Sequence, residues 1–471
     1  MTGAGIRASL LREWDHRVAT VGEANPALTC PILPPSVTGL AVNTLRPQYG
    51  PPVLPQHQSQ PHQPTVRQDG RLRILALGTE WHSGHGGLST FNRQLCRALA
   101  AAGAEVICVV LRKSPEDEGD AAAQGVKLVA ATRTPGQPEK EAISRRPRLP
   151  ESFVPNVIIG HGRVTGPVAQ ILAEDHFLEA RRLHFVHMAP EEIEWFKLDR
   201  GDDAGARAED RTQIELDLGR TAARVIAVGP RLYNRYLRDL HPYDVPSPLR
   251  LDPGFDAQSV GAGNPPPGAP WKVLLLGRLE DDYLKGLDFA ARAVGLAASR
   301  REPGAKALEL EVRGARPDTS TELQRKLREW SGYPPLNVVV RPFTTDTVGL
   351  DAEIKSASLL LMPSRSEGFG LVGLEAIVAG TPVLVRSESG LGAMLRETLE
   401  HEQAGRIVVP MSGDDEEDGE RWGRDVEGML RDREAAFRRA MEVRALLATR
   451  KTWAAAVASL LAELRELRAR R

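Results

Sequence analysis

The pattern of apolar positions predicts two series of alternating strands and helices. In the first series, short runs of consecutive apolar residues are typical of strands buried on both faces of a parallel sheet. Stretches with helical periodicity separate them, such as residues 89–102, which end at Gly103. The predicted strands of this series are 72–77, 105–110, 156–159, 183–187 and 224–228. Strands that alternate with helices favour a parallel sheet with right-handed crossovers.

A proline-rich stretch separates the first series from the second. Seven prolines fall between residues 245 and 270, and the strand pattern then restarts at Trp271 with a run that ends in Gly277. The further predicted strands of the second series are 308–312, 337–340, 359–362 and 383–385. We therefore predict two doubly wound domains, whose ligands would bind at the carboxyl ends of the strands.

The ends of the chain have different compositions. Residues 1–70 are rich in proline and glutamine and are expected to form a disordered extension. The predicted domains are 71–248 and 249–445, and residues 446–471 are predicted to form an amphipathic helix that packs back across the domains. The acidic run 414–418 is interpreted as a solvated loop.

Composition excludes several classes of protein. The 471 residues have a formal net charge of −1, so nothing favours a nucleic-acid partner. The three cysteines are too few and too scattered for a disulfide framework, which favours a reducing compartment. No signal peptide is apparent, and no apolar run reaches the roughly 18–20 residues of a membrane helix. These features predict a cytoplasmic protein with no transmembrane segment. Arginines at the end of the last helix leave peripheral membrane contact as an alternative to packing on the protein.

The run 364–376 contains the clearest candidate chemistry. Glu367 and Glu375 stand eight residues apart around a predicted strand end, a glycine turn and a helix start. Such a turn presents free backbone N–H groups and the positive end of a helix dipole to an anion. Carboxylates on the same segment could accept hydrogen bonds from hydroxyl groups. The run therefore predicts a site for phosphate together with sugar hydroxyls.

Two other loops also follow strands. Gly277-Arg278 and Lys285 could offset the charges of a diphosphate, although ordinary surface cations would give the same pattern. Residues 84–87 resemble part of a dinucleotide fingerprint, but Ser89 stands at the third glycine, which argues against a nicotinamide dehydrogenase. Asp281-Asp282 lacks the Asp-x-Asp spacing of metal-dependent transferases, so we predict no metal.

Together these elements resemble the retaining glycosyltransferases of family 4, which have a GT-B fold. The resemblance spans roughly residues 72–460. It implies an α/β chain with two Rossmann-like domains facing a central cleft, the first for the acceptor and the second for the donor. It also implies transfer of a hexose from a UDP- or GDP-sugar to an acceptor hydroxyl with anomeric retention. No cofactor is expected beyond this donor.

The resemblance also implies roles for individual residues. Arg278 and Lys285 would stabilise the leaving diphosphate, Glu375 would hold the ribose, and Glu367 would lie against the transferred sugar. His187, at the end of a predicted strand, is a catalytic candidate near that sugar. The remaining implied donor contacts are Gly277, Gly368, Phe369, Gly370 and Leu371; the acceptor and diphosphate loop is Gly86, Gly87 and Leu88; and His161 is a weaker candidate.

One segment departs from the family pattern, and several alternatives stay open. Residues 387–394 lack the acid that many family members have after the strand at 383–385, which leaves the donor contacts there unassigned. The alternatives are another GT-B enzyme, such as a phosphorylase or an epimerase, and a catalytically silent protein that binds sugar nucleotides. The acceptor could be a saccharide, a lipid or a small molecule.

Overall fold

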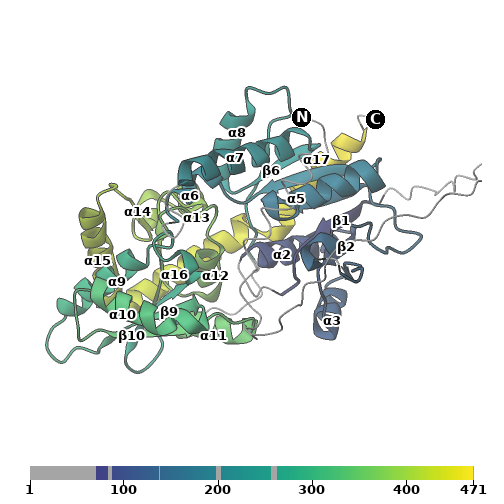
Figure 1. Ribbon diagram of the computed structural model, residues 1–471. Coiled ribbons are helices and arrows are strands. Elements are labelled where there is room, and N and C mark those ends of the chain that lie inside the picture. The colour runs from purple at the N-terminus through teal and green to yellow at the C-terminus, as the bar shows by residue number, and fades with distance from the viewer. Residues whose placement is uncertain (1–70, 83–86, 137, 198–202, 256–262, 470–471) are drawn as a thin grey trace, which may run out of the picture. The chain divides into compact units, whose positions relative to one another are not determined.

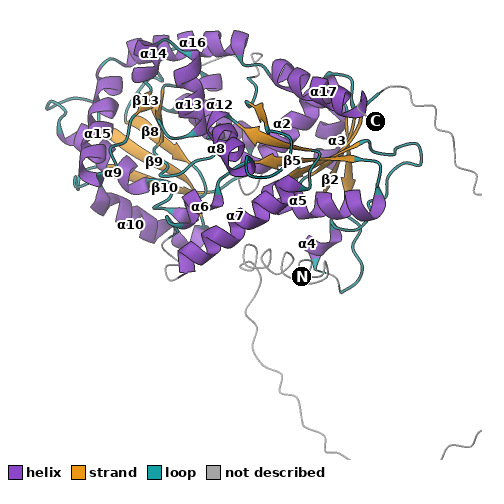
Figure 2. Cartoon of the chain, turned by 90° about the horizontal axis from the view of Figure 1, so that it is seen from above, coloured by secondary structure: helices purple, strands orange, loops and turns teal. Residues whose placement is uncertain are grey.

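Two parallel sheets, each with helices on both sides, organise the chain (Figures 1 and 2). The computed structural model describes residues 71–82, 87–136, 138–197, 203–255 and 263–469. The predicted extension at 1–70 lies outside these ranges. The predicted fold class, two doubly wound α/β sheets, is confirmed.

The first sheet has seven parallel strands in the order β3-β2-β1-β4-β5-β6-β7. Their bounds are β1 Arg73–Leu77, β2 Glu105–Val110, β3 Val126–Ala130, β4 Val157–His161, β5 Arg181–Val186, β6 Arg224–Val228 and β7 Leu249–Leu251. The order reverses between β1 and β4, which pair with each other. The sequence pattern missed the two edge strands, because β3 is partly exposed and β7 has only three residues.

The helices of the first half connect these strands as crossovers. They are α2 Gly87–Ala101, α3 Pro115–Ala123, α4 Glu139–Ala142, α5 Gly162–Ile171 with the π-helical turn η2 Leu172–His176, α6 Pro190–Glu194, α7 Ala204–Arg220 and α8 Pro230–Leu240. Because every pairing in the sheet is parallel, the carboxyl ends of all its strands lie at one edge.

The second sheet has six parallel strands in the order β10-β9-β8-β11-β12-β13. Their bounds are β8 Trp271–Leu276, β9 Leu308–Ala315, β10 Asn337–Pro342, β11 Leu359–Met362, β12 Val383–Arg386 and β13 Val408–Val409. The connecting helices are η4 Leu279–Asp281, α9 Leu287–Ser299, η5 Pro317–Thr319, α10 Ser320–Trp330, α11 Thr347–Ser356, α12 Leu371–Ala379, α13 Gly390–Thr398 and α14 His401–Gly405. The order reverses between β8 and β11, so the loops after these strands flank the switch point where such sheets bind ligands.

The acidic run near residue 415 is not a loop, and that prediction was wrong. Helix α15 (Asp415–Arg431) begins within it, and Asp414 caps the helix by accepting hydrogen bonds from the backbone N–H groups of Glu416 and Glu417. Asp418 is buried and accepts from the backbone of Ser412. Carboxylates are favoured there because they meet the positive end of the helix dipole.

Two helices end the chain and pack on different halves of it. Helix α16 (Arg433–Arg450) packs on α12, and α17 (Trp453–Ala469) packs on α2 of the first half (Figure 1). The rings of Trp453 and Phe91 are 5.6 Å apart, and Arg224 forms an ion pair with Glu463. Among the residues that the structure describes, no helix is both long and apolar enough to span a lipid bilayer.

Candidate active site

The turn between β11 and α12 has the backbone geometry of an anion-binding site. Gly370 is the N-cap of α12 with a φ of 102°, in the left-handed region where L side chains are strained. A Cβ at this position would also collide with the side chain of Met362. No side chain among the described residues caps the helix, so its first N–H groups remain available to a ligand.

The loop after β8 brings a cation to this turn. Lys285 Nζ lies 2.8 Å from a carboxylate oxygen of Glu367, and both side chains are partly exposed. Gly286, with a φ of 67°, lies against the carbonyl of Pro363 where a side chain would not fit. The Lys-Gly pair therefore lets the two loops touch and places the ammonium group beside the carboxylate.

Arg365 holds the loop after β8 against the turn between β11 and α12. Its guanidinium makes a forked contact with Asp288, at 2.6 and 2.7 Å, and lies over the ring of Tyr283. Its backbone N–H donates to the carbonyl of Leu284, the neighbour of Lys285, at 2.8 Å. Because the side chain is buried and fully engaged, Arg365 is a positioning residue for the loop that presents Lys285.

Two histidines at the strand ends of the first sheet form a hydrogen-bonded chain. His161, at the end of β4, contacts the side-chain oxygen of Asn92 through Nε2 at 2.9 Å. Its Nδ1 lies 3.0 Å from Nε2 of His187, just beyond β5. If the Asn92 oxygen accepts from His161, then His161 Nδ1 accepts from His187. This order of donors leaves the Nδ1 lone pair of His187 without a partner among the residues that the structure describes.

Both imidazoles are neutral at physiological pH. Burial, aided by the nearby His184, lowers the pKa of His187 to about 3. Burial and the adjacent His187 also hold the pKa of His161 well below its ordinary value. With its N–H donated to His161, His187 can therefore offer a lone pair to a ligand, but not a positive charge.

Several close contacts join the Glu367 turn to the first sheet. Gly368 lies directly against the backbone carbonyl of His187, and Phe369 packs on Gly229 at the end of β6. Arg231 donates to the carbonyl of Glu367 at 3.0 Å and also forms an ion pair with Glu192. These contacts bring strand ends of both sheets to one site.

Gly87, which follows β1 and begins α2, lies close to the same helix terminus. A Cβ added to Gly87 would lie 3.0 Å from Cδ1 of Leu371, so the two residues are in close proximity. Leu88 is partly buried in the first turn of α2, and Gly86 lies outside the described residues. The predicted loop thus lies beside the N-terminus of α12 in its described part.

Glu375 lies about one turn into α12 and has an unusual carboxyl group. Part of its side chain is accessible, yet the loss of water around the carboxyl group raises its pKa to about 7, while the guanidinium of Arg93 acts in the opposite direction. Arg93 is on α2 of the first half, and its Nη1 is buried with no hydrogen-bond partner among the described residues. The carboxyl group of Glu375 is therefore close to half-ionised at neutral pH.

The remaining predicted residues lie near these groups. The aliphatic stem of Lys285 passes over Gly277, and Arg278 follows β8 as an exposed residue. The sequence analysis missed Arg231, although Gly229-Pro230-Arg231 follows a strand as Gly277-Arg278 does. It also missed Asn92, because nothing in the sequence marks a helical asparagine as the partner of a distant histidine. Within the described ranges, no group of three His, Cys, Asp or Glu is arranged to hold a metal ion.

Known proteins resemble this chain over most of its length. The glycogen synthase of Mycobacterium tuberculosis is 27% identical over 418 residues, which cover 81% of this chain and 92% of that protein. The D-inositol 3-phosphate glycosyltransferase of an Arthrobacter species is 27% identical over 332 residues, covering 65% of this chain and 75% of the other.

Solved structures show the same fold. Sucrose-phosphate synthase from Thermosynechococcus elongatus aligns with a TM-score of 0.59 at 21% identity, over 85% of this chain and all of that one. Anabaena HepE in complex with UDP-glucose aligns with a TM-score of 0.58 at 16% identity, over 84% of this chain and all of HepE. These structures are GT-B glycosyltransferases, which confirms the predicted GT-B fold.

A family assignment covers the described unit almost completely. The family described as "Family 4 Glycosyltransferase in conflict systems" matches residues 75–460. Apart from the first two residues of β1, both sheets lie within this range, as does the whole site built around Glu367 and His187. The chain therefore belongs to the family 4 glycosyltransferases of conflict systems and is an enzyme that transfers a sugar from a nucleotide sugar.

Proposed function

We propose that the enzyme transfers a hexose from a UDP- or GDP-sugar to an acceptor hydroxyl, with retention at the anomeric carbon and without a metal ion. The observation that supports this most is the Lys285–Glu367 contact of 2.8 Å beside the uncapped N-terminus of α12. A cation, a carboxylate and free N–H groups then face one ligand, which suits a diphosphate joined to a sugar.

The donor would contact residues on both sides of the turn between β11 and α12. Lys285 and Arg278 would neutralise the charge that develops on the leaving diphosphate, the work that a metal ion performs in other transferases. The ribose hydroxyls would donate to Glu375, and the transferred sugar would lie against Glu367 and the backbone of Gly368 and Phe369. Lys285 is held by Glu367 in the structure, so a bound diphosphate would share or replace that partner.

Retention would follow from reaction on a single face of the sugar. The bond between the anomeric carbon and the diphosphate oxygen breaks, and the acceptor oxygen then bonds to that carbon from the same side. The proton of the acceptor hydroxyl leaves with the diphosphate oxygen. Neutral His187 would accept a hydrogen bond from a sugar hydroxyl through Nδ1 and orient the ring, with His161 and Asn92 holding its tautomer.

A panel of nucleotide sugars tests the donor assignment. We expect a UDP- or GDP-hexose to raise the melting temperature of the purified full chain, with and without EDTA. Proton NMR of the product would then give the anomeric configuration. No stabilisation by any nucleotide sugar would contradict the proposal, and an inverted product would contradict the single-face mechanism. A requirement for inorganic phosphate would indicate a phosphorylase instead.

A pair of substitutions tests the diphosphate contact. We expect the double variant Arg278→Ala/Lys285→Ala to lower kcat by about 100-fold or more, since two charged donors to the leaving group are lost. The double variant Arg325→Ala/Lys355→Ala is the matched control, because both residues form short-range helical ion pairs away from the site. Turnover that survives the first double variant would exclude the assigned role.

A further inference from the structure

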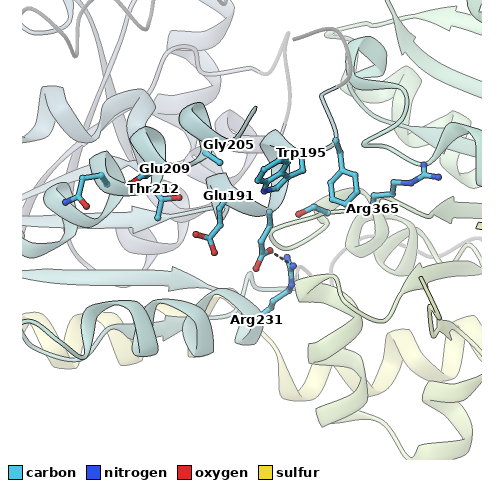
Figure 3. A pocket seen from close by; sticks show the side chains of 12 residues that line it. Glu191, Trp195, Gly205, Glu209, Thr212, Arg231 and Arg365 are labelled. Atoms are coloured by element: carbon cyan, nitrogen blue, oxygen red, sulfur yellow. Dashed lines mark hydrogen bonds and ion pairs between the residues drawn. The ribbon is translucent and has the colours of Figure 1, made fainter. Parts of the chain in front are cut away.

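A cavity of about 860 Å³ lies beside the Glu367 turn (Figure 3). We call it the α6–α7 cavity. Its walls are α6 with the two residues that follow it, one face of α7, the side chain of Arg231, and Arg365 and Ser366 of the turn. The volume falls in the range of small-molecule sites. None of the roles assigned above to donor contacts uses this space.

One wall of the cavity is aromatic. Trp195 is 62% exposed, although large apolar side chains are usually covered. Its ring rests on Gly205 of α7, where an added Cβ would lie 3.3 Å from the ring (Figure 3). Phe196, the next residue, packs near the ring of Tyr283 at 6.2 Å. An exposed indole that rests on a helix offers a flat surface to the C–H face of a ligand ring.

A second wall of the cavity presents the hydroxyl group of Ser366. Ser366 is only 7% exposed, and its side chain forms no hydrogen bond to any residue that the structure describes. It lines the cavity and directly precedes Glu367, which is 2.8 Å from Lys285. On α7, the side-chain oxygen of Thr212 also lines the cavity and is buried with no hydrogen-bond partner among the described residues, a cost that a ligand or water would relieve. Because Ser366 adjoins Glu367, a ligand in the cavity would reach the donor sugar's position beside Ser366.

The remaining charge in the cavity is negative. Arg231 is paired with Glu192, and Arg365 with Asp288, so neither guanidinium lacks an anionic partner. Glu209 of α7 lines the cavity and has no ion pair with any described residue. An anionic ligand would meet this free carboxylate, whereas hydroxyl or ammonium groups could donate to it.

We propose that the α6–α7 cavity is an acceptor subsite for a neutral or amine-bearing saccharide. The sugar ring stacks on Trp195, its polar groups donate to Glu209, and the reacting hydroxyl lies beside Ser366 and the donor. This inference rests on the proposed transfer function and names its acceptor class. Residues of α6 and α7 would then recognise the acceptor together with the glycine loop before α2.

Saccharide binding can be measured without turnover. Maltose, glucosamine and glucose 6-phosphate serve as neutral, cationic and anionic probes, titrated calorimetrically into the full chain with saturating nucleoside diphosphate. We expect maltose or glucosamine to bind, and glucose 6-phosphate to bind at least about tenfold more weakly. Trp195→Ala should weaken saccharide binding about tenfold or more, since the stacking surface is lost, while Trp195→Phe should retain most of it. Ser366→Ala tests the second wall.

The matched control is Leu178→Ala, which removes an exposed apolar side chain, 75% accessible, outside the cavity. Equal saccharide affinity in wild type and Trp195→Ala would overturn the subsite, as would failure of both maltose and glucosamine to bind. Donor binding, followed by thermal shift, separates the two proposals. A chain that binds nucleotide sugars but no saccharide contradicts the acceptor class alone. A chain that binds saccharides through Trp195 but no nucleotide sugar supports the subsite and contradicts the transfer function.

Discussion

A methyl group added at Gly368 would force apart the two segments that meet at the site. In Gly368→Ala the new carbon would lie 1.9 Å from the backbone oxygen of His187, whereas ordinary contacts begin at about 3.4 Å. The turn and the end of β5 would have to separate by about 1.5 Å. The oxygen belongs to the backbone, and the position of a Cβ is set by the backbone, so no side-chain rotation can relieve the overlap. A displacement of about 1 Å at reacting groups can cost roughly 100-fold in rate.

We therefore expect Gly368→Ala to lower kcat/KM for transfer by about 100-fold. The melting temperature should fall by only a few degrees, because overpacking of this kind costs about 1–3 kcal/mol. Initial rates of nucleoside diphosphate release, together with thermal unfolding followed by circular dichroism, measure the two effects separately. A loss of activity with a nearly unchanged fold would show that the close approach is needed for the reaction.

Gly428→Ala is the matched control for this substitution. Gly428 lies in α15, and a Cβ there would meet nothing within 4 Å. Alanine favours helices over glycine by about 1 kcal/mol, so this variant should be slightly more stable and fully active. If Gly368→Ala kept wild-type rates, the contact between the turn and His187 would be absent from the active enzyme, and the reasoning would fail.

Three further predictions concern protons at the site. Because the raised pKa of Glu375 is about 7, its ionised fraction should increase between about pH 6 and 8. The affinity for the donor should increase with it, and the donor KM should fall. Glu375→Gln should remove this pH dependence of the donor KM. The same raised pKa means that folding favours the protonated carboxyl, so ionisation through pH 7 lowers stability, and Glu375→Gln should melt above wild type at pH 8 but not at pH 5. His161→Phe should lower kcat about tenfold with little change in donor KM, since His187 loses its hydrogen-bond partner. Equal kcat values for wild type and His161→Phe would exclude the positioning role.

The sequence predicted the sheets well because their strands are buried on both faces. An uninterrupted apolar run such as Leu359–Met362 has few alternatives once glycine and proline bound it. The missed strands lack this signal: β13 has two residues and β7 has three, and their pairing depends on neighbours already in place. The acidic run before α15 was misassigned because clustered carboxylates suit both a solvated loop and a helix N-terminus.

Part of the site was also accessible from sequence. Lys285 and Glu367 both follow strands predicted to lie in one parallel sheet, and the carboxyl ends of such strands share an edge. Their 2.8 Å contact fits this rule, although the catalytic roles stay predictions. Asn92 and Arg365 gave no comparable signal. Each acts through a residue distant in sequence, and helical periodicity or a strand end cannot specify such a partner.

The glycines of the Glu367 turn suggest why transfer specificity would depend on both halves of the chain. Gly368 and Gly229 lack side chains where the first sheet and the turn touch, so the donor turn is seated on His187 and β6 rather than on its own sheet alone. Arg231 then joins the carbonyl of Glu367 to α6, whose end presents Trp195 to the cavity. A substitution that shifts α6 would therefore change the donor turn and the acceptor wall together. Donor and acceptor affinities should thus be coupled in such variants, whereas changes at Trp195 alone should affect only the acceptor.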